Sequence, residues 1–571
     1  MEYIVQKKET EKRKFLFRRS NPWTPQVCLL ETAILGVSAF TIAFKKGRMS
    51  CLMEKIVIYD TTLRDGMQAE GVSFSLEDKL AIAKRLDEFG VDYIEGGYAA
   101  SNPKEMQFFA EIAGLGLKNS KITAFGSTRR ANVSVSDDAS LNAMLACKTP
   151  AGTLVGKSWD LHVTKVLACS LDENLTICAE SVAHLKKRGL EVIFDAEHFY
   201  DGYKENPEYA IRVLEAAAEA GADALVLCDT NGGCLPEQVY EITKTVCERL
   251  STITIGVHTH NDTDCATGNS LAAVRAGARH VQGTINGLGE RCGNANLCTL
   301  IPNLAIKMGY DVLSDEKTRT LTEVSRFIYV IGNIAPVMNM PYVGESAFAH
   351  KGGLHVDALR KSKRTYEHIA PDLVGNERRF LISELSGKST VLAQLEKTEI
   401  AEDKQLARKI LNRVQHLENE GYQFEAANAS FDLLVKKIIG SHKSFFELIK
   451  YNVTVDKRAS GELVTEATVK LKVGGKTEHV VGEGDGPVNA LDAALRKSLE
   501  RFYPSIREIQ LIDYKVRIVN SKAGTAARVR VIIQSKDKTS HWGTVGVSEN
   551  IVEASWEALV DSVEYKLQKD S

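Results

Sequence analysis

The 571-residue chain has little proline, no CxxC pair and almost no net charge, and each absence narrows its class. Only 12 prolines stand against 42 glycines, a balance that suits an α/β protein with many tight loops. The net charge of −2 gives no electrostatic reason to expect nucleic acid or an anionic membrane as a partner. The 11 cysteines are an odd number, so reduced cytosolic thiols are a better interpretation than a disulfide framework.

What is present is typical of a globular protein with more than one hydrophobic core. Hydrophobic residues make up 44% of the chain and charged residues 26%. The chain is too long to fold around one hydrophobic core, so we expect about two to four domains.

The first 52 residues differ in texture from the rest of the chain. The basic stretch KKETEKRKFLFRR precedes an apolar run, VCLLETAILGVSAFTIAF, that contains one charge, Glu31. This run is short and interrupted for a membrane-spanning helix. The segment 1–52 is interpreted as a poorly ordered tail or as an upstream start, with Met49 or Met53 the working start; a targeting or anchoring extension stays open. The location expected is cytoplasmic.

From residue 55 to about residue 308, short β-rich runs alternate with amphipathic helical segments. Strands separated by helices imply parallel pairing, and eight such units imply a closed (β/α)8 barrel. The predicted strands are 55–60, 92–97, 121–126, 161–168, 191–196, 224–229, 254–258 and 280–285. Ser75 with Asp78, and Asn206 with Pro207, predict the starts of two of the helices.

The rest of the chain divides again by texture. Residues of about 320–430 are expected to be helical and irregular. From about residue 445 a pattern of three strands and a helix occurs twice, which predicts a small α+β domain with an internal repeat. The predicted boundaries are therefore an extension 1–52, a barrel 53–320, a helical linker region 321–430 and a C-terminal domain 431–571.

Polar residues gather where the predicted strands end, the edge at which a barrel of this kind places its site. In HTHND, His258 and His260 would point to the same side because strand side chains alternate. A carboxylate after the first strand and an amide oxygen after the last would complete a mixed nitrogen and oxygen site, suited to Mn, Mg or Zn. Arg64 would add positive charge where an alkoxide develops.

Each of these residues also has a plainer interpretation. His162 and His280 are expected to be packing histidines, whereas His198 is equally well a substrate-side residue or a loop residue. Cys228, Cys292 and Cys298 are interpreted as packing thiols because nothing pairs them with a base. The basic run 360–364 is expected to be a solvated loop, with coenzyme A phosphate as the alternative. The glycine-rich run 482–487 is expected to be a turn before a helix.

DTTLRDGMQ, HTHND and GERCGNANL together resemble the metal-dependent Claisen-condensing TIM barrels. That family includes 2-isopropylmalate, homocitrate and citramalate synthases, with hydroxymethylglutaryl-CoA lyase more distant. FDAEHFYDGYKENPEYA, LCDTNGG and ISELSGKS are most similar to the citramalate synthases of the group. The resemblance covers residues 54–571, and its C-terminal part resembles the amino-acid-sensing regulatory domain of isopropylmalate synthases.

The resemblance implies a role for particular residues. Asp65, His258, His260 and Asn294 match the metal ligands, and Arg64 matches the arginine at the substrate oxygen. Other matches are substrate-site residues and three residues that the family inserts into the neighbouring subunit's site, which implies a homodimer with composite active sites. The first group is Glu197, Thr230 and, more weakly, Gln68; the second is His355, Asp357 and Tyr366. GGYAASNPKE departs from the expected turn, so Ala99 and Ala100 leave the pocket rim undefined.

The implied reaction is an acyltransferase condensation of acetyl-CoA with pyruvate and water, giving (R)-2-methylmalate and CoA in isoleucine biosynthesis, with isoleucine as the effector. His355 or a water held by Glu197 would remove the methyl proton. The alternatives are a 2-isopropylmalate or homocitrate synthase, whose pocket admits a larger 2-oxo acid, and a non-catalytic amino-acid sensor. One methylene changes such a preference by only ~1–3 kcal/mol.

Overall fold

The computed structural model describes residues 53–381, 404–519, 524 and 526–571 of the chain. The predicted extension 1–52 and the segment ISELSGKS lie outside these ranges. Within them, no helix combines the length and the apolar character needed to cross a membrane. The described chain forms two units: one comprises the residues up to Phe348 together with Ile369–Glu377, and the other comprises Ala349–His368 and Arg378–Ser571.

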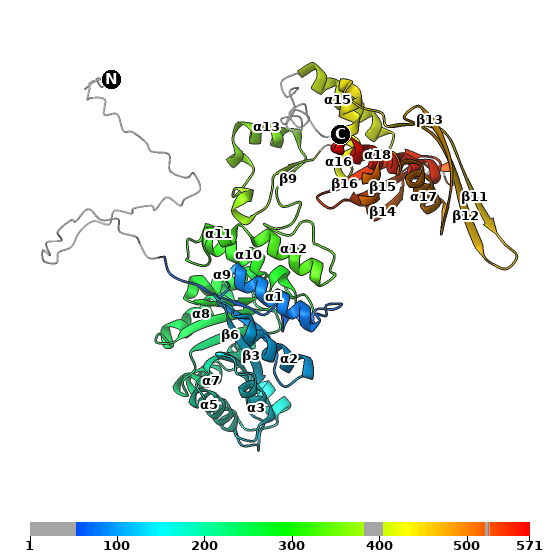
Figure 1. The fold of residues 1–571 in the computed structure, drawn as a ribbon. Helices are drawn as coiled ribbons and strands as arrows, with labels where there is room; N and C mark the ends of the chain where they lie inside the picture. The colour runs from blue at the N-terminus through cyan, green and yellow to red at the C-terminus, as the bar shows by residue number, and fades with distance from the viewer. Residues whose placement is uncertain (1–52, 382–403, 520–523, 525) are drawn as a thin grey trace, which may run out of the picture. The chain divides into compact units, whose positions relative to one another are not determined.

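The first unit is a closed eight-stranded barrel, which confirms the predicted fold class (Figure 1). Every neighbouring pair is parallel, and β8 closes on β1 with Tyr59 opposite Gln282. The strands are β1 Val57–Asp60, β2 Tyr93–Tyr98, β3 Lys121–Ser127, β4 Ala151–Lys157, β5 Glu191–Glu197, β6 Ala224–Asp229, β7 Thr254–Thr259 and β8 His280–Gly283.

Seven of the eight predicted strands overlap the observed ones, and the fourth is wrong. Residues 161–168 contain α4 (Asp160–His162) and a π-helical turn η3 (Val163–Leu167), whereas the strand is 151–157. AGTLVGK has two glycines, which lower strand propensity. Both are needed for close packing: a Cβ on Gly156 would come within 2.5 Å of the Phe194 ring, and one on Gly152 within 3.0 Å of Met144.

Helices surround the barrel strands (Figure 1). Ser75 forms the predicted capping box with Asp78, and Asn206 accepts a hydrogen bond from the Tyr209 N–H with Pro207 in the first turn. The helices of this unit are α1 Leu76–Phe89, α2 Pro103–Ile112, α3 Ala139–Ala146, α5 Leu171–Lys187, α6 Phe199–Glu205, α7 Pro207–Glu219, α8 Pro236–Arg249, α9 Ala266–Ala276, α10 Leu297–Pro302, α11 Asp315–Thr318 and α12 Leu321–Ile331.

The second unit contains the predicted repeat of three strands and a helix. Each half is an antiparallel three-stranded sheet with one helix against it. The first half is β11 Phe446–Lys457, β12 Leu463–Val473, β13 Lys476–Gly484 and α17 Pro487–Leu499; the second is β14 Gln510–Ile518, β15 Val529–Lys536, β16 His541–Ser548 and α18 Ile551–Asp570.

The two halves of the repeat are covered differently. One core joins both sheets with α17 and α18. A further core packs α15 (Lys404–Asn419) and α16 (Asn428–Ile439) against Val545 and Val547 on β16. The second sheet is therefore covered on both faces. The unit also holds α13 Gly353–Lys361 and the short pair β9 Ala349–His350 and β10 Arg379–Phe380.

Candidate active site

The two histidines of HTHND converge with a carboxylate from the other end of the barrel sequence. Nε2 of His258 lies 3.6 Å from Asp65 Oδ2, Nε2 of His260 lies 3.8 Å from it, and the two Nε2 atoms are 3.2 Å apart. All three residues are buried. Between them, Thr259 points the other way and bonds the Ser270 hydroxyl, as strand alternation requires. The arrangement is a compact nitrogen and oxygen cluster at the carboxyl end of the barrel.

Asn294 supplies a fourth group to this cluster. Its Nδ2 donates to Asp65 Oδ1 at 3.0 Å, and its buried Oδ1 has no hydrogen-bond partner among the described residues. A buried amide oxygen without a partner is costly unless a ligand satisfies it. Two imidazoles, a carboxylate and an amide oxygen are a donor set that fits a divalent metal. Asp65, His258 and His260 form the cluster suited to an ion in the part of the chain that the structure describes.

The protonation states also suit metal binding. Burial alone raises the pKa of Asp65, but the charge of Arg64, the two imidazoles when they are protonated and the hydrogen bond from Asn294 outweigh it and hold that pKa well below its usual range. Burial lowers the pKa of His258, and burial together with the neighbouring His258 lowers the pKa of His260 to about 4. At neutral pH the carboxyl is ionised and both imidazoles are neutral, the forms in which these side chains bind metals.

Arg64 is held beside the cluster by two carboxylates. Its Nη1 donates to Asp65 Oδ2 at 2.8 Å and its Nε to Glu95 Oε2 at 2.6 Å. The guanidinium carbon lies 4.1 Å from the centroid of the Phe125 ring. Glu95 is fully buried and also accepts hydrogen bonds from the hydroxyls of Tyr59 and Thr61. This network fixes a positive charge next to the metal-type cluster.

The loops after β5, β6 and β8 are tied to one another around the same edge. The Thr230 hydroxyl accepts from the His198 N–H at 2.9 Å, and the Thr230 carbonyl accepts from Arg291 Nη2 at 2.8 Å. Glu197 ends β5 and forms an ion pair with Lys157, the last residue of β4. Gln68 is exposed, and its N–H bonds the Asp65 carbonyl at 2.9 Å. Glu197 thus ends β5, Thr230 follows the neighbouring strand β6, and Gln68 lies on the turn after Asp65.

Several residues with plainer interpretations take defined places. His280 is buried in the barrel against the rings of Tyr59 and Tyr93. Burial raises the pKa of the Cys298 thiol to about 12, and Cys292 is exposed. His162 and His198 have rings 4.3 Å apart. The positions of Cys298 and His280 agree with a packing thiol and a packing histidine, whereas the expected packing role is wrong for the exposed Cys292. His198 lies beside the Thr230 loop.

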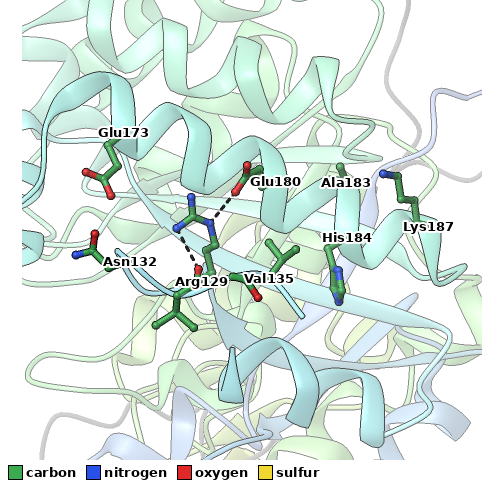
Figure 2. Close-up of a pocket in the computed structure, with 10 residues that line it drawn as sticks. Arg129, Asn132, Val135, Glu173, Glu180, Ala183, His184 and Lys187 are labelled. Carbon is green, nitrogen blue, oxygen red and sulfur yellow. Dashed lines mark hydrogen bonds and ion pairs between the residues drawn. The ribbon is translucent and has the colours of Figure 1, made fainter. Parts of the chain in front are cut away.

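The cavity in Figure 2 lies away from the metal-type cluster. It has a volume of about 590 Å³ and is lined by residues of the loop after β3 and by α5. Arg129 crosses it to donate to Glu180 at 2.8 Å and also bonds the Val133 carbonyl at 3.3 Å (Figure 2). We interpret these contacts as an anchor for the loop, since no residue of the cluster lines the space.

The three linker residues lie in the second unit. The rings of His355 and Tyr366 stack with centroids 4.0 Å apart, and Tyr366 is 47% exposed. Asp357 pairs with Lys361 on α13 at 2.6 Å. The structure therefore brings His355 and Tyr366 together as one group, separate from the barrel residues in the division of the chain.

Comparison with known proteins gives the family. Residues 55–328 match the HMGL-like model, 342–422 the homocitrate synthase post-HMGL domain-like model and 425–567 the LeuA allosteric (dimerisation) domain. Five relatives that are 45–56% identical are (R)-citramalate synthases. One of them, from Aquifex aeolicus, is 56% identical over 522 residues, covering 91% of this chain and 99% of the relative. The chain belongs to the (R)-citramalate synthase family.

Other known proteins are similar to the chain at lower sequence identity. A probable 2-isopropylmalate synthase from Methanopyrus kandleri is 32% identical, covering 89% of this chain and 98% of the relative. Among solved structures, an HMG-CoA lyase from Bacillus subtilis is 23% identical, covers 50% of this chain and 97% of its own, and has a TM-score of 0.43. The expected membership of the condensing family is confirmed, and with it an enzyme of the acyl-CoA condensation class that contains a divalent metal site.

Four residues at or behind the predicted site were not named as site residues from the sequence: Lys157, Glu95 and Gln282 contact its residues, and Asp195 contacts Gln282. Lys157 was missed because its strand was misplaced, and Glu95 lies within the predicted strand 92–97. Gln282 and Asp195 lie within strands that read as ordinary barrel sequence. The sequence could have pointed to Gln282 and Asp195, because an amide and a carboxylate within an apolar strand need hydrogen-bond partners when they are buried.

Proposed function

We propose that this chain is an (R)-citramalate synthase, which joins acetyl-CoA to pyruvate and water to give (R)-2-methylmalate and CoA. The observation that carries the proposal is the 45–56% identity to five such enzymes over about nine-tenths of the chain. The buried cluster of Asp65, His258 and His260 supports the proposal independently. Burying three polar side chains together is costly unless they bind a ligand such as a metal ion, and a barrel without catalytic function would not need that cluster. The pathway proposed is isoleucine biosynthesis.

The site residues have the following proposed roles. Asp65, His258, His260 and Asn294 would hold the divalent ion, with Mn, Mg and Zn as the candidates. When bound, that ion supplies a Lewis acid for the carbonyl of a 2-oxo acid. Arg64 places its guanidinium where the ketone oxygen of pyruvate becomes an alkoxide, and Glu95 keeps it in position.

Proton transfer falls to groups at the rim. The methyl group of acetyl-CoA must lose a proton before its carbon attacks the pyruvate ketone. His355 is one proposed base; a water held by Glu197 is the other, supported by the half-buried carboxylate that Lys157 pairs with at the end of β4. Thr230 and, more weakly, Gln68 are proposed to bind substrate. Water then cleaves the thioester, which releases CoA and makes the sequence effectively irreversible.

A homodimer with composite sites is the proposed assembly. The LeuA dimerisation domain supports pairing and regulatory binding. Two strands at sheet edges expose apolar side chains, a surface that a second copy would cover. These are Leu448, Ile449 and Val455 of β11 and Leu511, Ile512, Val516 and Ile518 of β14. His355, Asp357 and Tyr366 would enter the partner's barrel from the linker.

Mixing two inactive variants tests the composite site. Asp65→Asn removes a proposed ligand from the barrel, and His355→Ala removes a linker group. If each site needs one residue from each subunit, mixed dimers contain one site with both residues intact, and activity returns. If His355 serves its own barrel, each site of the mixture carries a defect and no activity returns. The control is the same mixing of Asp65→Asn with His260→Ala, which share one barrel.

The C-terminal domain is proposed to bind isoleucine as an effector. We also propose the division of the chain into 1–52, a catalytic barrel 53–320, a linker region 321–430 and a regulatory domain 431–571. The matches to three successive family models support that division. Inhibition by isoleucine, with leucine and valine as comparisons, tests the effector.

The first experiment is thiol release from acetyl-CoA in the presence of Mn or Mg. Pyruvate, 2-oxoisovalerate and 2-oxoglutarate are offered separately, with Asp65→Asn as the inactive control. Strong preference for pyruvate establishes the proposed reaction. Preference for 2-oxoisovalerate or 2-oxoglutarate would instead establish a 2-isopropylmalate or homocitrate synthase. No release with any acceptor would favour a non-catalytic sensor.

A further inference from the structure

His258 is held by an amide that reaches across the barrel interior. Its Nδ1 lies 2.9 Å from Gln282 Oε1 on β8, and Gln282 Nε2 donates to Asp195 Oδ1 on β5 at 3.0 Å. Gln282 is fully buried and Asp195 is 3% exposed. Strands β6 and β7 lie between β5 and β8 in the barrel, so the contact crosses the interior rather than linking neighbours.

In the orientation that the structure gives the Gln282 amide, the donors and acceptors from Asp195 to His258 follow one direction. A carboxyl oxygen accepts from the amide N–H, which turns the Gln282 carbonyl toward His258. The Nδ1 facing that carbonyl must then carry the hydrogen. The lone pair of the neutral imidazole is left on Nε2, the atom that faces Asp65 at 3.6 Å. His260 differs, since its buried Nδ1 has no partner among the described residues.

We propose that Gln282 and Asp195 are positioning residues that fix His258 in the tautomer whose Nε2 can bind a divalent metal. The proposal rests on the metal centre proposed above and adds two residues: Gln282 contacts the ligand His258, Asp195 contacts Gln282, and neither would touch the ion. Hydrogen-bond partners behind a ligating histidine commonly change metal affinity about 10- to 100-fold. Asp195 acts at one remove: it holds the orientation of the Gln282 amide, which holds the ring.

A purely structural role is the rival explanation. The same barrel has another buried polar group that links strands, in which the Tyr59 hydroxyl meets Thr123 at 2.9 Å and Thr153 at 2.6 Å. A link that only stabilises the barrel would, when removed, lower the free energy of unfolding and leave the metal affinity of the folded protein unchanged. Metal affinity therefore separates the two explanations.

The experiment measures Mn²⁺ binding to the full-length, metal-free protein by the electron paramagnetic resonance signal of the free ion. Gln282→Met keeps the length of the side chain and removes the acceptor. We expect its Kd to rise about 10- to 100-fold. Asp195→Asn should have a smaller effect, because the new amide lets Gln282 turn either way. The matched control is Thr243→Val, which removes a buried hydrogen bond of 2.8 Å to Tyr200 outside the barrel and should leave the Kd unchanged.

A double variant tests the direction of the chain. In Gln282→Glu with Asp195→Asn, the new carboxylate accepts from His258 Nδ1–H and from the new amide N–H, so the same tautomer is specified by reversed partners. We expect the Kd to return to within about threefold of the wild type. If the two substitutions acted independently, their losses would add and the Kd of the double variant would be higher than that of either single variant. Gln282→Glu alone sets two carboxyl groups against each other and should bind more weakly than the double variant.

The outcomes are separable. Folded Gln282→Met that binds Mn²⁺ as the wild type does would overturn the positioning role and leave the metal centre intact. A double variant that folds but binds no better than Gln282→Met would also overturn it. Wild-type protein that binds no Mn²⁺, or binds it equally well after His260→Ala, would overturn the metal centre and this proposal with it.

Discussion

Replacing Glu95 with glutamine removes one negative charge from the site and almost no volume. Glu95 is fully buried, and three donors point at its two oxygens. Oε1 accepts from the Tyr59 hydroxyl at 2.6 Å, and Oε2 accepts from Arg64 Nε at 2.6 Å and from the Thr61 hydroxyl. A glutamine satisfies the arrangement only by turning its amide nitrogen toward Tyr59, whose hydroxyl can accept. Arg64 then loses a charged partner and keeps a neutral one.

The cost follows from the kind of hydrogen bond that is weakened. A hydrogen bond to a charged group is worth about 1.5–3 kcal/mol, roughly twice a neutral one. Arg64 keeps its charge and its second contact, to Asp65 at 2.8 Å, but its guanidinium is held in place less firmly. Taking about 2–3 kcal/mol for the misplacement gives a fall of roughly 30- to 150-fold in rate. The loss should appear mainly in kcat, because the alkoxide that we propose Arg64 to stabilise exists only after the ketone is attacked.

Steady-state thiol release with pyruvate as the varied substrate measures this effect. The matched control is Tyr59→Phe, which removes the hydroxyl contacts to Thr123, Thr153 and the other oxygen of Glu95 and leaves both Arg64 contacts in place. It should lower kcat less than Glu95→Gln does, because Arg64 keeps both carboxylate partners and therefore its position. Guanidinium unfolding of both variants shows whether they fold. A folded Glu95→Gln enzyme with wild-type kcat, or equal losses in the two variants, would refute the reasoning.

The remaining predictions concern the barrel core. Gly156→Ala should lower the free energy of unfolding by about 1–3 kcal/mol, because the new methyl group meets the Phe194 ring; Gly114→Ala, with no atom near, is the control in the same guanidinium titration. Burial lowers the pKa of His280 from 6.5 to about 3. The unfolded chain therefore binds the proton first, and stability present above pH 6.5 is lost as the pH falls toward 3, by about 2 kcal/mol at pH 5. In guanidinium titrations, His280→Phe should reduce the difference in the free energy of unfolding between pH 5 and pH 7. The same difference in the variant and the wild type would contradict the prediction.

Several features follow from local sequence alone. HTHND gives two side chains on one face because alternation is a property of any extended strand, and Asp65 and Arg64 follow an apolar run whose end must lie at the same edge of a parallel barrel. The repeat of three strands and a helix is likewise visible as two similar patterns. These inferences need only periodicity and order along the chain.

Other features needed the folded barrel. The pattern of AGTLVGK does not predict a strand, and only the structure shows that Phe194 and Met144 occupy the space beside its glycines. The pattern of 161–168 predicts a buried strand, but in the structure Val166 is 65% exposed. The partners of Glu95 and Gln282 lie on strands far away in the sequence.

The sequence by itself therefore determined which residues face the site, because side-chain direction is local. Only the tertiary structure decided which buried polar groups meet. Closing eight strands brings Asp195 of β5 and Gln282 of β8 within hydrogen-bond distance across a buried interior, where a polar group without a partner is costly.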